Sequence, residues 1–514
     1  MTLKAYVNIF PPESLAQKVY AADQVRLVEP KAAALAGISM YQLMERAGQA
    51  VVDKMQQLFP KTEKLLVLAG HGNNGGDAYV VARLAKNLGI NTTLCEFGKC
   101  EKLSEDAANA RKKWLATGAT PALFNEQVLS DFDLCIDGLL GTGIKGEVRT
   151  ALASVIGRIN ASDIDVLAID VASGLNADTG AISGIAIEAA ATVTFIGIKS
   201  GLVTSTGKQH TGQLFFDDLG VGDEFNRLAV PVAKLISFEQ LNPLPPRPIA
   251  AHKGSFGKLL CIGGNAGYAG AIRIAGEAAL RCGAGLVKVY CHKQSQQSIS
   301  IGRPELMTES REEQYLEALK WATAIVIGPG LGKDNWAYRA LKFALDHCLQ
   351  FHKPLVLDAD ALNLIAQHKR LVVPKNLAIL TPHPAEAARL IEGTVARVES
   401  DRYQVARDLS MHYDAVTLLK GAGTLVTSQN NTWVCTDANP GMASPGMGDL
   451  LSGVLGSLLA QGMSNRLSAI FGACLHSAAA DVASKREGER GLMASDLLPD
   501  LRKLVNKEQR VLCS

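Results

Sequence analysis

The stretch Gly446-Met-Gly-Asp449 places glycines and a carboxylate directly before an apolar run. The apolar residues of 450–458 repeat at helical spacing, which predicts a tight loop leading into the first turn of a buried helix. Unpaired backbone N–H groups at such a helix start, together with the helix dipole, attract an anion such as phosphate. We therefore expect Gly446, Met447 and Gly448 to form an anion hole.

Asp449 is the residue of this stretch that could do acid–base chemistry. A carboxylate repels phosphate, so it is a poor phosphate ligand. It is well suited to take the proton from a hydroxyl that attacks phosphorus. Aspartates also cap helices, and this alternative stays open for Asp449 at this point.

A glycine-rich loop in the first half of the chain suggests a second site. The apolar run Leu65–Ala69 predicts a buried parallel strand, followed by a loop at His71–Gly76 and a helix from about Asp77 to Leu88. Strand, loop and helix in this order form the phosphate-binding crevice of an open α/β sheet. The loop is neither a Gly-x-Gly-x-x-Gly nor a Walker A motif. Its adjacent asparagines, Asn73 and Asn74, indicate a cation or ligand site or simply an asparagine-rich turn.

Two further predicted strands, 133–137 and 166–170, end in the acids Asp137 and Asp170. The carboxyl ends of parallel strands converge on the crevice where such sheets bind ligands. Oxygen ligands from Asn74, Asp137 and Ser173 suit a hard cation better than zinc. Either acid could also move a proton.

The second half repeats the alternation of strands and helices from Lys258 onward, which predicts a second α/β sheet. The loop 328–332 is rich in glycine and allows a ligand close to the backbone. His383 lies between two prolines, where its imidazole can present a hydrogen bond. The loop 420–424 combines glycines with a lysine and a threonine suited to nucleotide phosphates. The segment 358–363 ends a strand with two acids, one of which is a candidate to organise a metal.

Length and composition bound these expectations. A chain of 514 residues is too long for one core, and the proline-rich segment 221–256 predicts a boundary between domains 1–225 and 226–514. A net charge of +2 argues against a dedicated nucleic-acid binder. The ten cysteines are scattered, mostly inside apolar runs, which favours buried free thiols. The N-terminus lacks a signal-peptide pattern. The weakly charged run 182–203 is interpreted as a strand and its flanks. We therefore expect a cytoplasmic protein without a membrane span.

Four motifs of the first half, at 43–48, 72–77, 137–143 and 170–174, resemble the NAD(P)H-hydrate epimerase domain over about 20–220. The resemblance implies a Rossmann-like, three-layer α/β domain that interconverts the R and S forms of hydrated NAD(P)H. It implies catalytic roles for Asp137 and Asp170, and a potassium ion held by Asn74, Asp137 and Ser173. Ala172 stands where the family usually has proline. The residues implied to bind the hydrate are Asn73, Asn74, Gly75, Gly76, Asp77, Gly141, Thr142, Gly143, Ile144, Lys145, Gly146, Glu147 and Asp170.

The second half resembles the ribokinase-like superfamily, and more closely the ADP-dependent (S)-NAD(P)H-hydrate dehydratases, over about 250–510. Motifs at 266–271, 284–287, 381–384 and 439–444 carry this resemblance. It implies a ribokinase-like α/β/α domain in which Asp449 deprotonates the phosphate-accepting hydroxyl. Met447 stands where the family often has threonine. Hydrate contacts are implied for Ala271, Gly330, Gly332, His383 and Asp449, and nucleotide contacts for Lys420, Gly421, Ala422, Gly423, Thr424 and Gly448.

Together the two resemblances imply a bifunctional enzyme acting on hydrated NADH and NADPH. The first half would supply the S epimer, and the second would dehydrate it with ADP as co-substrate and Mg²⁺ on the nucleotide, giving AMP and phosphate. ADP rather than ATP rests on the resemblance. One rival is a kinase of a small-molecule alcohol, such as a vitamin precursor; another makes the first half a non-catalytic nucleotide-binding module. Composition leaves a homo-oligomer open.

Overall fold

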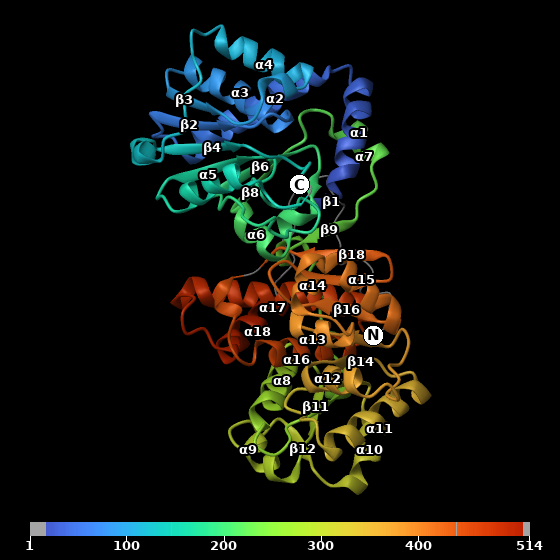
Figure 1. The fold of residues 1–514 in the computed structure, drawn as a ribbon. Coiled ribbons are helices and arrows are strands. Elements are labelled where there is room, and N and C mark those ends of the chain that lie inside the picture. The colour runs from blue at the N-terminus through green and yellow to red at the C-terminus, as the bar shows by residue number, and fades with distance from the viewer. Residues whose placement is uncertain (1–16, 145, 438, 507–514) are drawn as a thin grey trace. The chain divides into compact units, whose positions relative to one another are not determined.

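The computed structural model describes residues 17–144, 146–437 and 439–506, drawn in Figure 1. Contacts divide these residues into two compact units, the first extending to residue 234 and the second beginning at residue 235. The division follows residue 234 rather than residue 225, because helix α7 (Gly222–Leu228) packs against α1 (Ala22–Leu35) inside the first unit. It still falls within the proline-rich segment 221–256.

The first unit is built on a parallel sheet with the strand order β3-β2-β4-β5-β6-β8. Alternate residues of its strands belong to different cores: Leu65, Val67 and Ile136 face one, and Leu66, Leu68 and Cys135 face the other. Both faces are therefore buried, which explains the continuous apolar runs in the sequence. The strands are β2 (Lys64–Ala69), β3 (Asn91–Glu96), β4 (Leu134–Gly138), β5 (Asp165–Ile169), β6 (Ala191–Phe195) and β8 (Gln213–Asp217).

Helices cover both faces and give this unit its three layers. Figure 1 shows α2 (Met40–Leu58), α3 (Asn73–Asn87) and α4 (Glu105–Leu115) on one side of the sheet, with α5 (Thr150–Asn160) on the other. The apolar residues Leu43, Met44, Ala47, Val51 and Met55 form a buried face of α2, and a capping box between Ser39 and Gln42 starts the helix. The unit also contains α6 (Ser205–Thr211) and the short strands β1 (Lys18–Tyr20) and β7 (Ile198–Lys199), and β9 (Ala233–Ile236) pairs with β1.

Helix α3 begins at Asn73, so the prediction of a loop through Gly76 is wrong. A Cβ atom on Gly75 would lie 2.0 Å from the Gly70 carbonyl oxygen, and one on Gly76 would lie 2.6 Å from the Met44 side chain. The two glycines let the first turn of α3 press against its neighbours. The glycine-rich composition thus reflects close helix packing as well as a loop.

In the second unit the strand order is β12-β11-β10-β13-β14-β15-β16-β17-β18. Pairs are parallel as far as β16, and β17 and β18 then form antiparallel pairs that the sequence did not predict. The strands are β10 (Lys258–Ile262), β11 (Leu286–Tyr290), β12 (Met307–Glu309), β13 (Ala324–Ile327), β14 (Leu355–Leu357), β15 (Ala378–Leu380), β16 (Val416–Leu419), β17 (Thr424–Ser428) and β18 (Asn431–Cys435).

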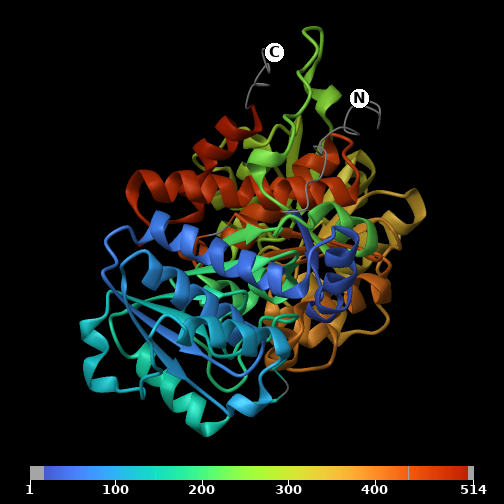
Figure 2. The ribbon, with the colours of Figure 1, turned by 90° about the horizontal axis from the view of Figure 1, so that it is seen from above.

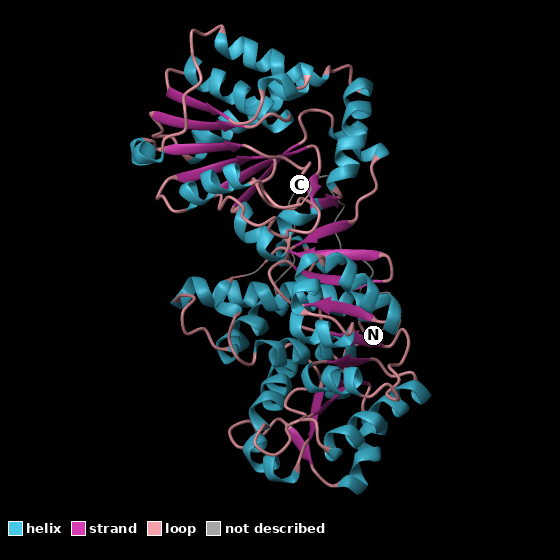
Figure 3. Cartoon of the chain, in the orientation of Figure 1, coloured by secondary structure: helices cyan, strands magenta, loops and turns pink. Residues whose placement is uncertain are grey.

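Helices α8, α16 and α17 bury their apolar residues in one core against this sheet, and Figure 3 shows the strands flanked by helices. The fold class predicted from the sequence is confirmed. The helices are α8 (Ala269–Arg281), α9 (Gln296–Ser300), α10 (Tyr315–Trp321), α11 (Asn335–Phe351), α12 (Ala359–Gln367), α13 (Pro384–Leu390), α14 (Val395–Ser400), α15 (Arg402–Tyr413), α16 (Met447–Ala460), α17 (Asn465–Glu487) and α18 (Leu498–Val505).

Helix α17, the long red helix of Figure 2, is long and apolar enough to cross a membrane by length and composition. However, 72% of its most apolar window is buried inside the protein. Phe471, Cys474 and Leu475 belong to the core shared with α16. The apolar character of α17 is therefore accounted for by packing within its unit.

Candidate active sites

The start of α16 has the geometry expected of an anion hole. Gly446 is its N-cap, with φ +86°, and no side chain caps the helix there. The positive φ strongly favours glycine. The Met447 side chain is buried in the apolar core, so Met447 can offer a bound group only its backbone. Methionine in place of the family's usual threonine thus removes one hydroxyl but keeps the backbone N–H donors of this turn.

Asp449 lies in the first turn of α16. Burial raises its pKa to about 7, and the nearby carboxylates of Asp358 and Glu386 add to the shift while Lys420 opposes it. A carboxylate with a pKa near neutrality can exchange protons with a substrate under physiological conditions. Its environment therefore suits a general base better than a simple helix cap.

Lys420 connects the loop after β16 with the start of α16. Its Nζ lies 2.9 Å from Asp358 Oδ1 and 3.8 Å from Glu386 Oε2. A Cβ atom on Gly448 would lie only 3.2 Å from Nζ, so the absence of a side chain there makes room for the ammonium group. Burial works against the charge, but Asp358 and Glu386 outweigh it and raise the pKa of Lys420. A positive charge is thus fixed beside the anion hole.

The two acids at the end of β14 are already engaged. Asp358 is fully buried and accepts hydrogen bonds from Lys420 Nζ and, at 2.8 Å, from Ser452 Oγ. Asp360 accepts one from the Gly332 N–H at 2.9 Å and one from Asn363 Nδ2 at 3.2 Å. Their roles in this structure are to hold Lys420 and the 328–332 loop. The arrangement does not favour either acid as a dedicated metal ligand.

His383 forms the N-cap of α13. Its ring Nδ1 accepts a hydrogen bond from the Ala385 N–H at 3.1 Å, and its backbone N–H donates to Glu386 Oε2 at 2.8 Å. Burial and then the charge of Lys420 lower the pKa of His383, so the ring is neutral at pH 7. Burial raises the pKa of Glu386 to about 7. Glu386 was missed as a site residue, although its place at the third position of a capping box was visible in the sequence.

The remaining predicted residues of this half divide into two groups. A Cβ on Gly330 would lie 3.2 Å from Ala271 Cβ, so these two predicted hydrate contacts adjoin. In the 420–424 loop, Thr424 already belongs to β17 and donates to the Gly421 carbonyl at 3.0 Å. The loop is held from beneath by the buried guanidinium of Arg402, which donates to the Leu419 and Lys420 carbonyls. Gly421 and Ala422 are exposed and Gly423 is buried.

In the first unit, Asp137, Ser173 and Asn74 meet at the carboxyl end of β4. Asp137 is fully buried and accepts hydrogen bonds from Ser173 Oγ at 2.6 Å, the Ser173 N–H at 2.8 Å and the Leu139 N–H at 3.2 Å. Asn74 Nδ2 donates to the Leu140 carbonyl at 2.9 Å. Asn74 Oδ1 is buried and has no partner among the described residues. An orphaned buried oxygen beside a carboxylate and a hydroxyl fits a monovalent or other hard cation.

A cavity of about 480 Å³ adjoins this group. It is lined by Asn73, Asn74, Asp77, Gly141, Thr142, Gly143, Ile144, Glu147 and Asp170 from the predicted set. Gly75, Gly76 and Gly146 do not line it, and the first two pack α3 instead. Lys145 falls outside the described residues.

Asp170 faces the cavity from the end of β5 in a left-handed conformation, φ +61°. Its carboxylate pairs with the buried Lys199 and accepts a hydrogen bond from Thr194 Oγ1 at 3.0 Å. The sequence analysis did not propose Lys199 as a site residue. Its position inside an otherwise apolar run could have indicated a buried, paired lysine. An uncommon backbone conformation held by a buried ion pair is typical of a functional position.

Two further acids share this pocket. Burial raises the pKa of Glu29 to about 7, with Lys199 opposing and Asp170 adding to the shift. Burial, followed by Asp170 and Glu29, raises the pKa of Asp77 well above its usual range. Both acids therefore keep a proton to higher pH than ordinary carboxyl groups do, and they line the same cavity as Asp170 and Lys199. Acids with raised pKa values in one cavity suit proton donation and removal there.

Comparisons with known proteins match both halves. Residues 40–201 match the family model described as the YjeF-related protein N-terminus, and residues 259–503 match the model described as NAD(P)H-hydrate dehydratase. The bifunctional NAD(P)H-hydrate repair enzyme Nnr of Escherichia coli is 44% identical over 505 residues, covering 97% of this chain and 96% of that one. The chain belongs to the family of bifunctional NAD(P)H-hydrate repair enzymes.

Other known proteins are also similar to this chain. The Nnr protein of Coxiella burnetii is 42% identical over 492 residues, covering 95% of this chain and 99% of that one. A solved ADP/ATP-dependent NAD(P)H-hydrate dehydratase from Bacillus subtilis is 28% identical, covers 51% of this chain and 93% of its own, and has a TM-score of 0.46. The family predicted from the sequence, with an epimerase half and a dehydratase half, is confirmed by the full-length relatives.

Proposed function

We propose that residues 235–514 dehydrate the S form of hydrated NAD(P)H in a nucleotide-driven reaction in which Asp449 is the general base. Asp449 removes the proton of the ring hydroxyl, whose oxygen attacks the terminal phosphorus of ADP. The new O–P bond forms as the bond to the bridging oxygen breaks and AMP leaves. Phosphate then departs with the electrons of the ring C–O bond, and the neighbouring ring carbon loses a proton as the double bond re-forms.

The observation that carries this proposal is the meeting of Asp449, Lys420 and the helix start at Gly446–Gly448. Phosphoryl transfer spreads negative charge over the oxygens of phosphorus, and oriented N–H groups with a fixed ammonium stabilise that charge. Lys420 is fastened by Asp358 and does not need to reorganise during the reaction. We propose that the 420–424 loop and Gly448 hold the nucleotide, whose Mg²⁺ neutralises phosphate charge when bound.

His383, Ala271, Gly330 and Gly332 are proposed to contact the hydrate. The neutral imidazole of His383, oriented by Glu386, can exchange hydrogen bonds with a polar ring substituent without adding charge. Gly330 and Ala271 leave space where a bulkier pair would fill it.

For the first unit we propose epimerisation at the carbon that carries the hydroxyl, with Asp170, Asp137 and the protonated acids of the pocket as the groups that move protons. Asn74, Asp137 and Ser173 are proposed to hold potassium, which would orient the substrate's oxygens. Lys199 pairs with the Asp170 carboxylate and holds it in position. The cavity of about 480 Å³ offers room for the nicotinamide portion of the substrate.

The test is an assay of purified protein on the R hydrate, first with ADP and then with ATP. Recovery of the absorbance of reduced nicotinamide, with release of orthophosphate, is the expected result, and ADP is expected to be preferred. A small-molecule kinase would instead leave a phosphorylated acceptor and restore no absorbance. The cytoplasmic location and the oligomeric state remain predictions from the sequence.

A further inference from the structure

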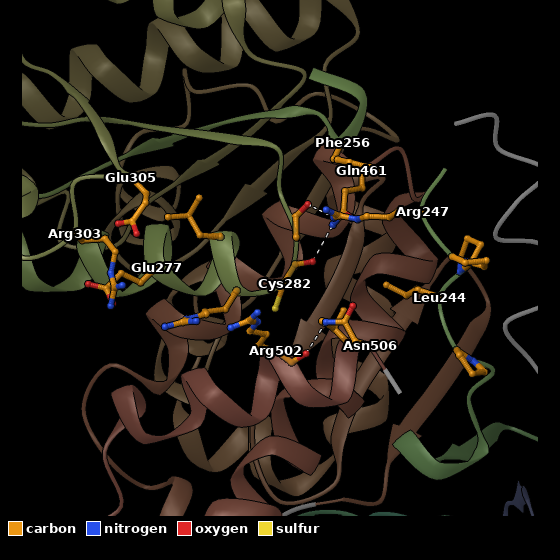
Figure 4. Close-up of a pocket in the computed structure, with 17 residues that line it drawn as sticks. Leu244, Arg247, Phe256, Glu277, Cys282, Arg303, Glu305, Gln461, Arg502 and Asn506 are labelled. Atoms are coloured by element: carbon orange, nitrogen blue, oxygen red, sulfur yellow. Dashed lines mark hydrogen bonds and ion pairs between the residues drawn. The ribbon is translucent and has the colours of Figure 1, made fainter. Parts of the chain in front are cut away.

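A separate cavity of about 870 Å³ lies in the second unit, drawn in Figure 4. Phe256 precedes β10, and Cys282 and Gly283 precede β11, so the cavity borders the ends at which these strands begin. Asp449, Lys420 and His383 lie at the opposite, carboxyl ends of the strands. The cavity is therefore distinct from the proposed dehydratase site.

One end of this cavity is occupied by Arg247. Its guanidinium lies 3.7 Å from the centre of the Phe256 ring and donates hydrogen bonds to the Gly283 carbonyl and to Gln461 Oε1. Gln461 Nε2 in turn donates to the Cys282 carbonyl at 3.1 Å. Figure 4 shows Arg247, Gln461 and Phe256 together. These contacts supply hydrogen-bond donors to the carbonyls of Cys282 and Gly283, which directly follow α8.

The other end holds an ion pair. Arg303 donates to Glu277 Oε2 at 3.0 Å, and Arg273 pairs with the same carboxylate at 2.8 Å. Arg303 Nε, by contrast, is buried and has no acceptor among the described residues. Figure 4 places Glu305 beside this pair. A buried donor without an acceptor is uncommon in native proteins and indicates a missing partner.

Arg281 and Arg502 also line the cavity, and neither guanidinium has a carboxylate partner among the residues that the structure describes. The lining carries four arginines against two glutamates, which leaves an excess of two positive charges. Each of the two arginines lies in the last turn of its helix, α8 or α18, where it favours the helix dipole. That role alone does not explain why both line the same cavity.

We propose that this cavity binds a phosphorylated small molecule. Uncompensated guanidinium groups on a concave surface attract anions and bind phosphate through paired N–H donors. Leu244, Leu280 and Val505 provide an adjoining apolar surface for the rest of the ligand. The size of the cavity falls in the range of small-molecule sites. The proposal concerns a second ligand site and does not depend on the reaction proposed for Asp449.

The test is a calorimetric titration of the full chain with inorganic pyrophosphate in a buffer that contains Mg²⁺, so that the nucleotide site can also accept the anion. Wild type is expected to bind at two sites, the nucleotide site and this cavity. R281Q/R502Q is expected to lose one site, or to bind there at least tenfold more weakly. K485Q/K503Q is the matched control, because it removes the same charge from exposed lysines that do not line the cavity and keeps both sites.

Equal stoichiometry and affinity in wild type and R281Q/R502Q would overturn the proposal, as would an equal loss in the lysine control or a single site in wild type. Unfolding temperature and dehydratase rate should match wild type in all variants, which separates this test from that of the proposed function. Should the double variant not fold, R502Q, at an exposed position, takes its place in the same titration with the same outcomes.

Discussion

Lys420 Nζ lies 2.9 Å from Asp358 Oδ1, and the same carboxylate accepts a hydrogen bond from Ser452 Oγ of α16. One buried acid thus fastens the loop after β16 to the helix that carries Asp449. The ammonium group is held beside Gly448 by structure that exists before any substrate binds. Preorganised charge of this kind contributes to catalysis because it needs no rearrangement in the transition state.

Replacing the proposed base should separate the two activities. We expect Asp449→Asn to slow dehydration by about 10²–10⁴-fold, the usual contribution of a general base. Exchange between the epimers should continue at the wild-type rate, because that site lies in the other unit. The measurement is recovery of nicotinamide absorbance from S hydrate with ADP, alongside epimer ratios by chromatography. Loss of both activities would contradict independent sites.

The pH dependence of dehydration should report the same residue. Asp449 acts as a base only when ionised, so kcat/KM is expected to rise with pH and level off above about 7. Lys420 lowers the pKa of Asp449. In Lys420→Gln, kcat/KM should therefore rise at a higher pH and reach a lower plateau. Lys485→Gln, on the exposed surface of α17, is the control and should keep the wild-type profile. An unshifted pH profile in Lys420→Gln would show that Lys420 does not lower the pKa of Asp449.

The raised pKa also has a cost in stability. An acid whose pKa rises from 3.8 to about 7 on folding stabilises the fold least when it is ionised, so the penalty grows from pH 4 to pH 7 and is complete above it. We therefore expect Asp449→Asn to unfold at a higher temperature than wild type at pH 8. The difference should shrink as the pH is lowered to 5.5. Thermal melts at both pH values test this, and a constant difference would argue against the shift.

The cation site of the first unit can be tested through exchange. Asp137→Ala should slow epimer exchange and abolish its dependence on potassium, because the variant loses the carboxylate next to the orphaned Asn74 Oδ1. Pure S hydrate should still be repaired at the normal rate. Exchange rates measured in potassium and in lithium salts are the readout. A variant that keeps both rate and potassium response would place the cation elsewhere.

Lys199→Met should reduce epimer exchange by roughly tenfold or more, since Asp170 loses its counter-charge and its orientation. Breaking a buried ion pair also destabilises the fold by about 3–5 kcal/mol. The dehydratase rate of the same sample checks the second unit, and circular dichroism checks the first. Lys199→Arg should restore part of the exchange rate, and Lys99→Met, at an exposed position, should leave it unchanged. Full exchange in Lys199→Met would show that the pair is only structural.

Local patterns in the sequence predicted most of the sheet and the acids at its edge. Apolar runs located β2, β4 and β5, since a strand that is buried on both faces has a continuous run of apolar residues. Asp137, Asp170 and Asp449 were proposed as site residues because a carboxylate after such a strand, or after a glycine turn at a helix start, lies where open α/β sheets bind ligands. The start of α3 was misplaced because glycines mark close packing as well as loops.

Residues whose role depends on a distant partner could not be predicted. Lys199 and Glu386 acquire their roles from Asp170 and Lys420, which are far from them in sequence or on another strand. Asp358 was noticed as a possible metal ligand, but its oxygens are used by Lys420 and Ser452, which only the folded chain shows. The hairpin of β17 and β18 was hidden because Thr424 was interpreted as part of a phosphate loop.

Within the described chain, Asp358, Glu386 and Asp360 all push the pKa of Asp449 upward, while Lys420 is the cation that acts against them. The proposed nucleotide site thus has several carboxyl groups close to the place where a polyanionic co-substrate would bind. These carboxyl groups would repel a nucleotide without a bound metal ion more strongly than a nucleotide that carries a divalent cation. The carboxyl groups around Asp449 should therefore make the site bind the metal–nucleotide complex more tightly than the free nucleotide.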